Sequence, residues 1–130
     1  MSEATYLCGG INGLSDSDCK DWRAVATELL SSQVIDPMRR DYRGREDDCV
    51  GEIVEGDLSD IAASHYILVN ATRPSWGTAM EIRTAWLLKK KICCFVGTAA
   101  SVSPWLRYHS DAIVASVENA VAQIESWRCK

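Results

Sequence analysis

Residues 65–90 read HYILVNATRPSWGTAMEIRTAWLLKK, and this stretch contains one complete strand-loop-helix unit. Its first six residues, 65–70, are strongly apolar, which predicts a strand that is buried on both faces of a sheet. Pro74 and Gly77 interrupt the apolar run, so the residues between strand and helix are predicted to form a loop. Residues 77–90 then show helical spacing and end in lysines, where the helix dipole favours cations. A doubly buried strand followed by a helix indicates a parallel α/β sheet.

The sequence on both sides of this unit repeats the alternation. Apolar runs predict strands at 5–8, 34–36, 92–96 and 112–114, and periodic stripes predict helices at 18–31 and 116–128. Residues 48–64 are predicted to include another helix, although Gly56-Asp57 is an alternative start for a separate short one. Residues 38–49 are polar and are predicted to be a loop. The expected fold class for residues 1–130, taken as a single domain, is α/β, a doubly wound parallel sheet of about five strands with helices on both faces.

Composition narrows the functional classes. The 130 residues are 47% apolar and 25% charged, with a net charge of −4, which is typical of an ordinary globular protein. An acidic balance argues against a nucleic-acid polymer as partner, because such binders carry a basic stripe. No apolar run approaches the roughly 20 residues that span a bilayer, so no membrane partner is expected. The N-terminus does not resemble a signal peptide, which predicts a cytoplasmic protein.

The cysteines and histidines do not form the spacing patterns of a metal site. Cys8, Cys93 and Cys94 lie in apolar runs, where a free cysteine behaves as a small hydrophobe, and the sequence contains no C-x-x-C pair. The six cysteines are therefore expected to be reduced. His65 is expected at the start of a strand and His109 in a loop, and neither has a partner at metal-binding spacing. We expect no metal and no organic cofactor.

Three loops are expected at the carboxyl edge of the sheet, where parallel α/β proteins bind ligands: residues 9–13, 37–45 and 71–77. The first contains Gly9 and Gly10, whose unobstructed backbone amides suit a phosphate or a sugar, although a plain tight turn explains them equally well. In the second, Arg39, Arg40 and Arg43 are expected to supply charge to a phosphate or an edge to a base, and a solvated loop explains them as well. The third contains Trp76, whose side chain could either pack in the core or stack on a base, and the sequence favours neither role.

Two carboxylates are candidates for catalysis. Glu81 lies in the first turns of the helix that follows the third loop, where the helix dipole is expected to keep it ionised. An ionised carboxylate in a cleft can attack an anomeric carbon, although a solvated helix-start glutamate fits the spacing too. Asp57 and Asp60 form a pair that can divide the roles of acid and base, and helix capping is the alternative.

Three segments, residues 6–10 (YLCGG), 56–61 (GDLSDI) and 74–81 (PSWGTAME), together resemble the nucleoside 2-deoxyribosyltransferase family. That family includes the 2'-deoxynucleoside 5'-monophosphate N-glycosidases, and the resemblance extends over residues 5–115. It implies a flavodoxin-like sheet of five parallel strands, with neither metal nor organic cofactor. It also implies a homo-oligomer, a dimer, tetramer or hexamer, in which a neighbour's loop closes the site; here that loop is residues 103–106.

The resemblance assigns roles to individual residues. Glu81 is the nucleophile that attacks C1', Asp57 protonates the departing base, and Tyr6 holds Glu81 through its phenol. The expected substrate-binding residues are Gly9, Gly10, Asn12, Arg43, Asp60, Ser75, Trp76, Gly77 and Ser103.

Ser75 departs from the transferase pattern, which often has an aspartate six residues before the nucleophile. In this respect the chain resembles the nucleotide hydrolases of the family, whose serine helps to hold the 5'-phosphate. The expected function is nucleoside 2-deoxyribosyltransferase, with nucleosides or nucleotides and free nucleobases as partners, and the alternative is a 5'-monophosphate N-glycosidase. A nucleotide-binding module without turnover is a third possibility, against which the Glu81 and Asp57 pair argues.

Overall fold

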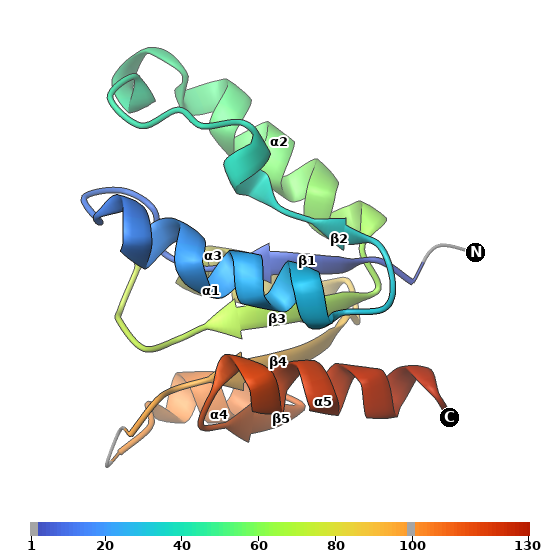
Figure 1. Cartoon of the computed structure of the whole chain (residues 1–130). Coiled ribbons are helices and arrows are strands. Elements are labelled where there is room, and N and C mark those ends of the chain that lie inside the picture. Colours follow the sequence, from blue (N-terminus) through green and yellow to red (C-terminus); the bar gives the residue numbers. More distant parts are fainter. Residues whose placement is uncertain (1–2, 99–100) are drawn as a thin grey trace.

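In the computed structural model, which describes residues 3–98 and 101–130, five parallel strands form one sheet in the order β2-β1-β3-β4-β5 (Figure 1). The strands are β1 (Thr5–Cys8), β2 (Val34–Ile35), β3 (Tyr66–Asn70), β4 (Lys91–Phe95) and β5 (Ala112–Val114). β3 lies at the centre and pairs along its length with β1 and β4. Because the chain passes from β1 to β2 on one side and reaches β3 on the other, the strand order reverses at the carboxyl ends of β1 and β3. Ligands of doubly wound sheets bind at such a reversal.

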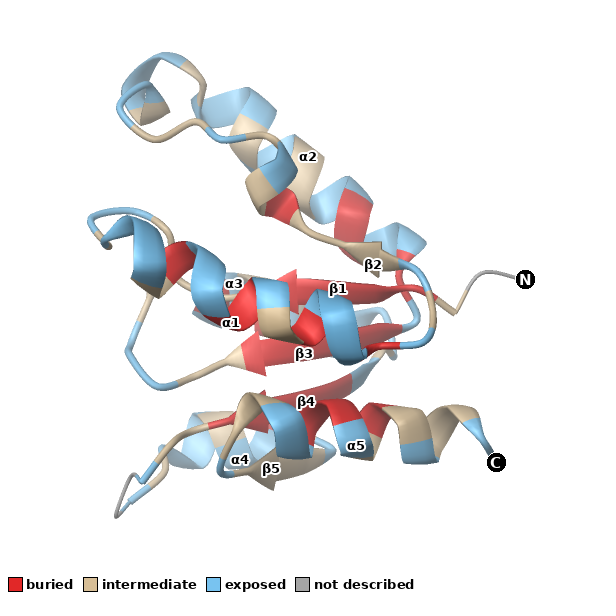
Figure 2. Cartoon of the chain, in the orientation of Figure 1, coloured by how far each residue is buried: buried red, intermediate tan, exposed pale blue. Residues whose placement is uncertain are grey.

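Helices cover both faces of this sheet. Helices α1 (Asp16–Leu29) and α5 (Val117–Arg128) pack on one face. Helices α2 (Val50–Ala63), α3 (Trp76–Leu87) and α4 (Pro104–His109) pack on the other. The three inner strands β1, β3 and β4 are mostly buried, the edge strands β2 and β5 are of intermediate exposure, and the outer helical surfaces are exposed, as Figure 2 shows. This explains why the sequence of β3 is continuously apolar instead of alternating.

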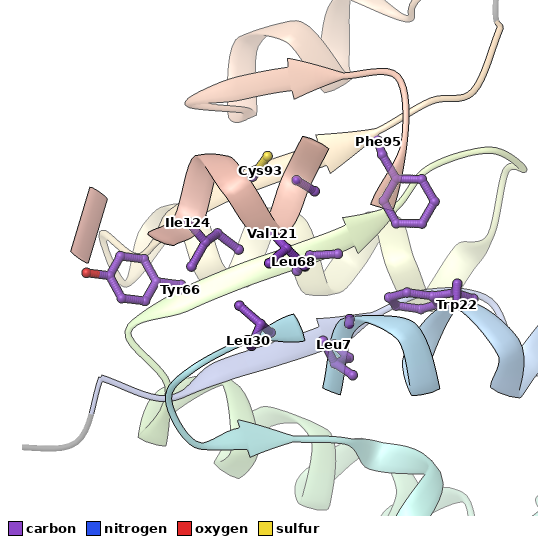
Figure 3. Close-up of a cluster of buried hydrophobic side chains, with 11 residues drawn as sticks. Leu7, Trp22, Leu30, Tyr66, Leu68, Cys93, Phe95, Val121 and Ile124 are labelled. Atoms are coloured by element: carbon purple, nitrogen blue, oxygen red, sulfur yellow. The ribbon is translucent and has the colours of Figure 1, made fainter. Parts of the chain in front are cut away.

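The core consists of two clusters separated by the sheet. On the α1 and α5 face, the cluster includes Leu7 and Leu68 of the strands, Trp22 of α1, and Val121 and Ile124 of α5 (Figure 3). On the opposite face, the strand side chains meet α2, α3 and α4; this second cluster is Tyr6, Cys8, Ile61, Ile67, Val69, Ile82, Ala85, Ile92 and Cys94. Alternate residues of β1 therefore serve different layers, and Tyr6 and Cys8 both face α3.

The predicted strands and long helices are confirmed, and serine caps fix the starts of three of the long helices. Ser15, Ser75 and Ser116 accept hydrogen bonds from backbone amides at the starts of α1, α3 and α5. The alternative break at Gly56 does not occur, because α2 runs without interruption past it. The guanidinium of Arg40 lies against Gly56, where a Cβ would meet Arg40 Nη2 at 3.0 Å. Tertiary contact thus explains this glycine.

The segment near residue 105 differs from its prediction. Residues 103–106, expected to be a loop, begin helix α4, with Ser103 as N-cap and Pro104 at its first position. His109, expected in a loop, is buried in the last turn of this helix. The helix was missed because it is only 6 residues long, too short to show a period.

Two smaller expectations can also be compared with the structure. The polar segment 38–49 is mostly irregular, with short 3₁₀ turns at Pro37–Arg39 and Glu46–Asp48. All six cysteines lie in the described ranges and are free thiols, as predicted. Within residues 3–98 and 101–130, no helix has the length and hydropathy needed to cross a membrane.

Candidate active site

Glu81 lies in the second turn of α3 and reaches toward β1. The phenol of Tyr6 donates a hydrogen bond to Glu81 Oε2, and the Cys8 Sγ lies 3.5 Å from Glu81 Oε1. Both donors come from alternate positions of one strand, so the backbone of β1 fixes their spacing. The helix is fixed at its start by Ser75, whose Oγ accepts from the Thr78 amide at 3.4 Å. The two elements together hold one carboxylate from both sides.

Burial dominates the ionisation of Glu81. Its pKa is raised to about 7, mainly because the carboxylate is buried, while the Tyr6 hydrogen bond opposes the shift and the charge of Asp57 adds to it. The expectation that the helix dipole keeps Glu81 ionised is therefore wrong. The dipole acts mainly within the first turn of a helix, and Glu81 lies in the second, so desolvation outweighs the effect of the dipole. Burial, together with the Glu81 charge, raises the pKa of Tyr6 far above its usual range. Tyr6 is consequently a permanent donor.

Asp57 lies in the middle of α2, close enough for its charge to raise the pKa of both Glu81 and Tyr6. It does not cap a helix, so the capping alternative is wrong for this residue. Burial raises the pKa of Asp57, and the charge of Arg40, whose Nη2 lies 3.5 Å from Asp57 Oδ1, opposes this shift. Two carboxylates with raised pKa values therefore interact electrostatically. In such a pair, the presence of a proton on one carboxyl group favours the ionised form of the other.

Asp60 is held by two arginines. Arg39 forms a bidentate pair with it, with distances of 2.8 and 3.0 Å, and Arg40 Nη2 lies 2.7 Å from Asp60 Oδ2. Burial raises the pKa of Asp60, but these hydrogen bonds outweigh it and lower the pKa overall. Arg40 therefore links Asp60 to Asp57. The sequence did not identify this connection, because the arginines and the aspartates lie about twenty positions apart.

Arg23 is a buried arginine that the sequence prediction missed. Its Nη1 donates to the Leu7 carbonyl at 2.7 Å and its Nη2 to the Gly9 carbonyl at 3.1 Å. Asp36 pairs with it at 3.2 Å. The positive charge also lowers the pKa of Glu81 and of Asp57. Its only signal in the sequence was a position beside Trp22 on the apolar stripe of α1.

A cleft of about 340 Å³ opens beside this site, at the start of α3. The glycine-rich loop and the α3 entry loop line it, with Gly10, Asn12, Arg73, Ser75, Trp76 and Gly77 among the lining residues. A Cβ on Gly10 would lie 3.6 Å from the Ser75 Cβ, and one on Gly9 would clash with the Trp22 ring at 2.7 Å. The chain from Cys8 to Gly10 therefore follows the first turns of α3 from Glu81 to Ser75. The cleft lies at the Ser75 end of this path, and Glu81 is not among its lining residues.

The other predicted site residues lie in varied surroundings. Trp76 is 86% exposed, which rules out core packing for this side chain and leaves stacking open. Arg43 bonds to Asp41 and Asp16, which occupy its guanidinium within the chain. Ser103 is exposed and accepts from the Trp105 amide at 3.2 Å. Arg73, which was not predicted, pairs with Asp18 at 3.0 Å beside the cleft.

Comparison with known proteins supports the fold. No protein-family model matches the chain, and no curated protein sequence matches it. Among solved structures, the CMP N-glycosidase BcmB of Clostridium botulinum is 15% identical, with a TM-score of 0.62 over 94% of this chain and 98% of that one. A conserved protein from Enterococcus faecalis V583 is 11% identical, with a TM-score of 0.73 over 97% and 99%.

A third structure is the 2-deoxyribosyltransferase of the psychrotolerant bacterium Bacillus psychrosaccharolyticus. It is 14% identical, with a TM-score of 0.72 over 93% of this chain and 95% of that one. The predicted α/β fold with five parallel strands is thereby confirmed. Two of the three proteins carry names from the family that the sequence motifs resemble.

The raised pKa of Glu81 predicts a stability that depends on pH. The folded state binds a proton more tightly than the unfolded chain, so the free energy of unfolding should fall as pH rises from about 4.5 to about 7. Glu81→Gln, which keeps the shape and can still accept from Tyr6, should remove this dependence. We expect it to increase the free energy of unfolding at pH 8 by roughly 1 to 3 kcal/mol. Urea unfolding at pH 5 and pH 8 measures this, and Glu28→Gln on the exposed side of α1 is the control. A Glu81→Gln protein no more stable than wild type at pH 8 would contradict the buried carboxylate.

Proposed function

We propose that this chain cleaves the N-glycosidic bond of a 2'-deoxynucleoside and transfers the sugar to a second base, with Glu81 as nucleophile. The observation that carries the proposal is the half-buried Glu81 carboxylate, which reaches β1 and has a donor at each oxygen. A surface glutamate would need neither donor. Asp57 supplies a second carboxyl group in the same field. This is the pairing that a retaining displacement at a sugar requires.

In the first step, ionised Glu81 attacks C1' and forms a glycosyl ester. The C1'–N bond breaks, its electron pair goes to the base, and protonated Asp57 gives its proton to the base nitrogen. Burial raises the pKa of Asp57, which increases its protonated fraction, and the step proceeds from the state in which Asp57 holds the proton and Glu81 is ionised. The high pKa of Tyr6 keeps its proton out of the exchange, so Tyr6 orients the carboxylate and does not act as an acid.

In the second step, the incoming base attacks C1' of the glycosyl ester from the face opposite Glu81. Asp57, now a carboxylate, takes a proton from the incoming base, whose nitrogen attacks C1' as the ester bond to Glu81 breaks. The two inversions together retain the configuration at C1'. With water in place of the base, the same sequence of steps gives free sugar. The names of the similar structures, a 2-deoxyribosyltransferase and a CMP N-glycosidase, correspond to these two outcomes and support the proposal.

Hydrolysis of a 5'-monophosphate is the second candidate, and the cleft favours it. The α3 N-terminus, with Ser75 and Gly77, opens into the cleft, and backbone amides at a helix start attract phosphate. Gly10 and Asn12 face it from the first loop. Arg73 also lines the cleft, where its charge is paired with that of Asp18, another lining residue. Position 75 carries an uncharged hydroxyl, where an aspartate would repel a dianion.

We also propose that the chain acts as a homo-oligomer. Large apolar side chains on the neighbouring helices α3 and α4 are exposed: Trp76 by 86%, Trp105 by 76%, Tyr108 by 68% and Met80 by 64%. Side chains of this size seldom remain in water without a partner. A second copy covering them would also enclose the cleft, which Trp76 lines.

The first test of this function is the loss of the nucleophile. Glu81→Ala should lose roughly 10³-fold or more of the rate of base release, because the covalent route is removed. Chromatography of base release from deoxynucleosides, with and without a second free base, measures it, and Glu28→Ala is the matched control. A transferase makes new nucleoside in proportion to the added base. A Glu81→Ala rate within tenfold of wild type would refute the role of Glu81, and free sugar whatever base is added would favour the hydrolase.

The second test concerns the 5'-phosphate. Ser75→Asp keeps a good helix cap but adds a charge, so it should reduce the use of monophosphates by roughly 10²-fold while use of nucleosides changes little. Ser75→Thr, which keeps the hydroxyl, is the control. The measurement is kcat/KM for a nucleoside and for its 5'-monophosphate. Equal effects on both substrates would exclude Ser75 from phosphate binding.

The third test concerns the assembly. Light scattering should give a mass that is a multiple of the 14.4 kDa chain. Trp105→Glu places a charge on the exposed surface of α4 and should reduce this mass toward the single chain. Leu29→Glu, at an exposed apolar position of α1 on the opposite face of the sheet, should not. A wild-type mass of one chain would rule out the oligomer.

A further inference from the structure

Cys8 is buried beside the carboxylate but has no part in the steps described above. Its Sγ lies 3.5 Å from Glu81 Oε1 and 4.0 Å from the Thr78 carbonyl. The thiol is completely buried, and burial raises its pKa well above the usual range, so the sulfur keeps its proton. Between these two acceptors, the carboxylate is the nearer one and carries more charge. The contact is therefore an S–H donor to Glu81.

The position of this donor is set by the centre of the sheet. Tyr6 pairs with Ile67 of β3, and Cys8 pairs with Val69, so both lie in a strand held along its length. Neither residue can move without breaking the ladder. The phenol reaches Oε2 and the thiol reaches Oε1, and the two contacts define the plane of the carboxylate.

We propose that Cys8 is a positioning residue for Glu81, whose thiol fixes Oε1 as the oxygen that attacks C1'; this rests on the proposed function. A thiol is a weaker donor than a phenol, so Oε1 keeps more of its electron density than Oε2 does. An oxygen that is oriented but weakly bonded is the better nucleophile. A serine or an alanine at this position would change either the strength or the presence of the donor.

The thiol also affects the ionisation of Glu81. The groups that act on this carboxylate are Tyr6 and Cys8 from β1, Asp57 from α2 and Arg23 from α1. Burial and Asp57 raise its pKa, while the two hydrogen bonds and Arg23 lower it. Removing the thiol removes one of the stabilising contacts, so Glu81 should ionise at higher pH and fewer molecules would be active at pH 7.

The chain offers a matched control for this inference. Cys94 lies in β4, is equally buried and belongs to the same apolar cluster, but its thiol lies 3.2 Å from Ser110 Oγ instead of Glu81. Cys8→Ala and Cys94→Ala therefore remove the same atoms from the same layer, and only the first removes a donor to the carboxylate. Cys8→Ser restores a donor at the same position.

The test is the titration of the Glu81 carboxyl carbon by NMR, which requires no activity. We expect Cys8→Ala to raise the pKa of Glu81 by about 0.5 to 1 unit, and Cys94→Ala to leave it in place. Cys8→Ser should bring it back to within about 0.5 unit of wild type. Equal pKa values in Cys8→Ala and Cys94→Ala would overturn the proposal. If Cys8→Ala does not fold, the S–H infrared band of Cys8 in the wild-type protein is measured instead, and it is identified by its loss in Cys8→Ser. This band should shift as Glu81 ionises, and a band that does not change with pH would overturn the proposal.

Kinetics then separate this proposal from the proposed function. In an active enzyme, the acid limb of the kcat profile should move to higher pH in Cys8→Ala by the same amount as the titration, with kcat at pH 7 reduced roughly 2- to 5-fold and KM little changed. An unmoved acid limb would refute the positioning role. A wild-type chain without base release would refute the proposed function, and the NMR titration would still decide whether the thiol bonds to Glu81.

Discussion

A carboxylate that leaves water must be given hydrogen-bond donors, and the site depends on how this chain supplies them to Glu81. Burial, with a smaller contribution from the charge of Asp57, raises the pKa of Glu81 to about 7, despite the opposing bonds from Tyr6 and Cys8. Both donors come from β1, a strand that is buried and paired on both sides. Arg23, packed from the opposite face, binds the carbonyls at the end of the same strand. The apolar core thus holds the strand, and the strand holds the carboxylate.

The second carboxylate is controlled by a different device. Asp57 lies on α2 and is tied to Asp60 through Arg40, while Arg39 fixes Asp60 from the other side. Gly56 has no side chain, which allows the Arg40 guanidinium to lie flat against the helix. Two aspartates three positions apart therefore have opposite shifts: the pKa of Asp57 is raised by burial, and that of Asp60 is lowered by its arginines. The same residue type obtains different chemistry from its surroundings.

Helix α3 connects the carboxylate to the cleft. Ser75 and Gly77 lie at its start and line the cleft, and Glu81 follows on the same rigid element. Six residues of helix between positions 75 and 81 span about 9 Å, so an anion bound at the helix start lies a fixed distance from the nucleophile. The chain from Cys8 to Gly10 runs beside this helix. It supplies the thiol that contacts Glu81 and the loop amides near Ser75. This arrangement allows one ligand to contact both places, because the site is built from two elements that cannot shift independently.

The sequence by itself determined the layers of this protein. The apolar run 66–69 predicted the central strand, because a strand covered on both faces contacts water on neither, and the helical spacing of residues 77–90 predicted α3. The motifs around Tyr6, Asp57 and Glu81 predicted which side chains would lie together. Local pattern could not give the ionisation of Glu81, the donor role of Cys8 or the buried charge of Arg23, because each depends on residues far away in the chain. Only the tertiary structure decided these, since desolvation and hydrogen bonding are set by what packs around a group and not by its neighbours in sequence.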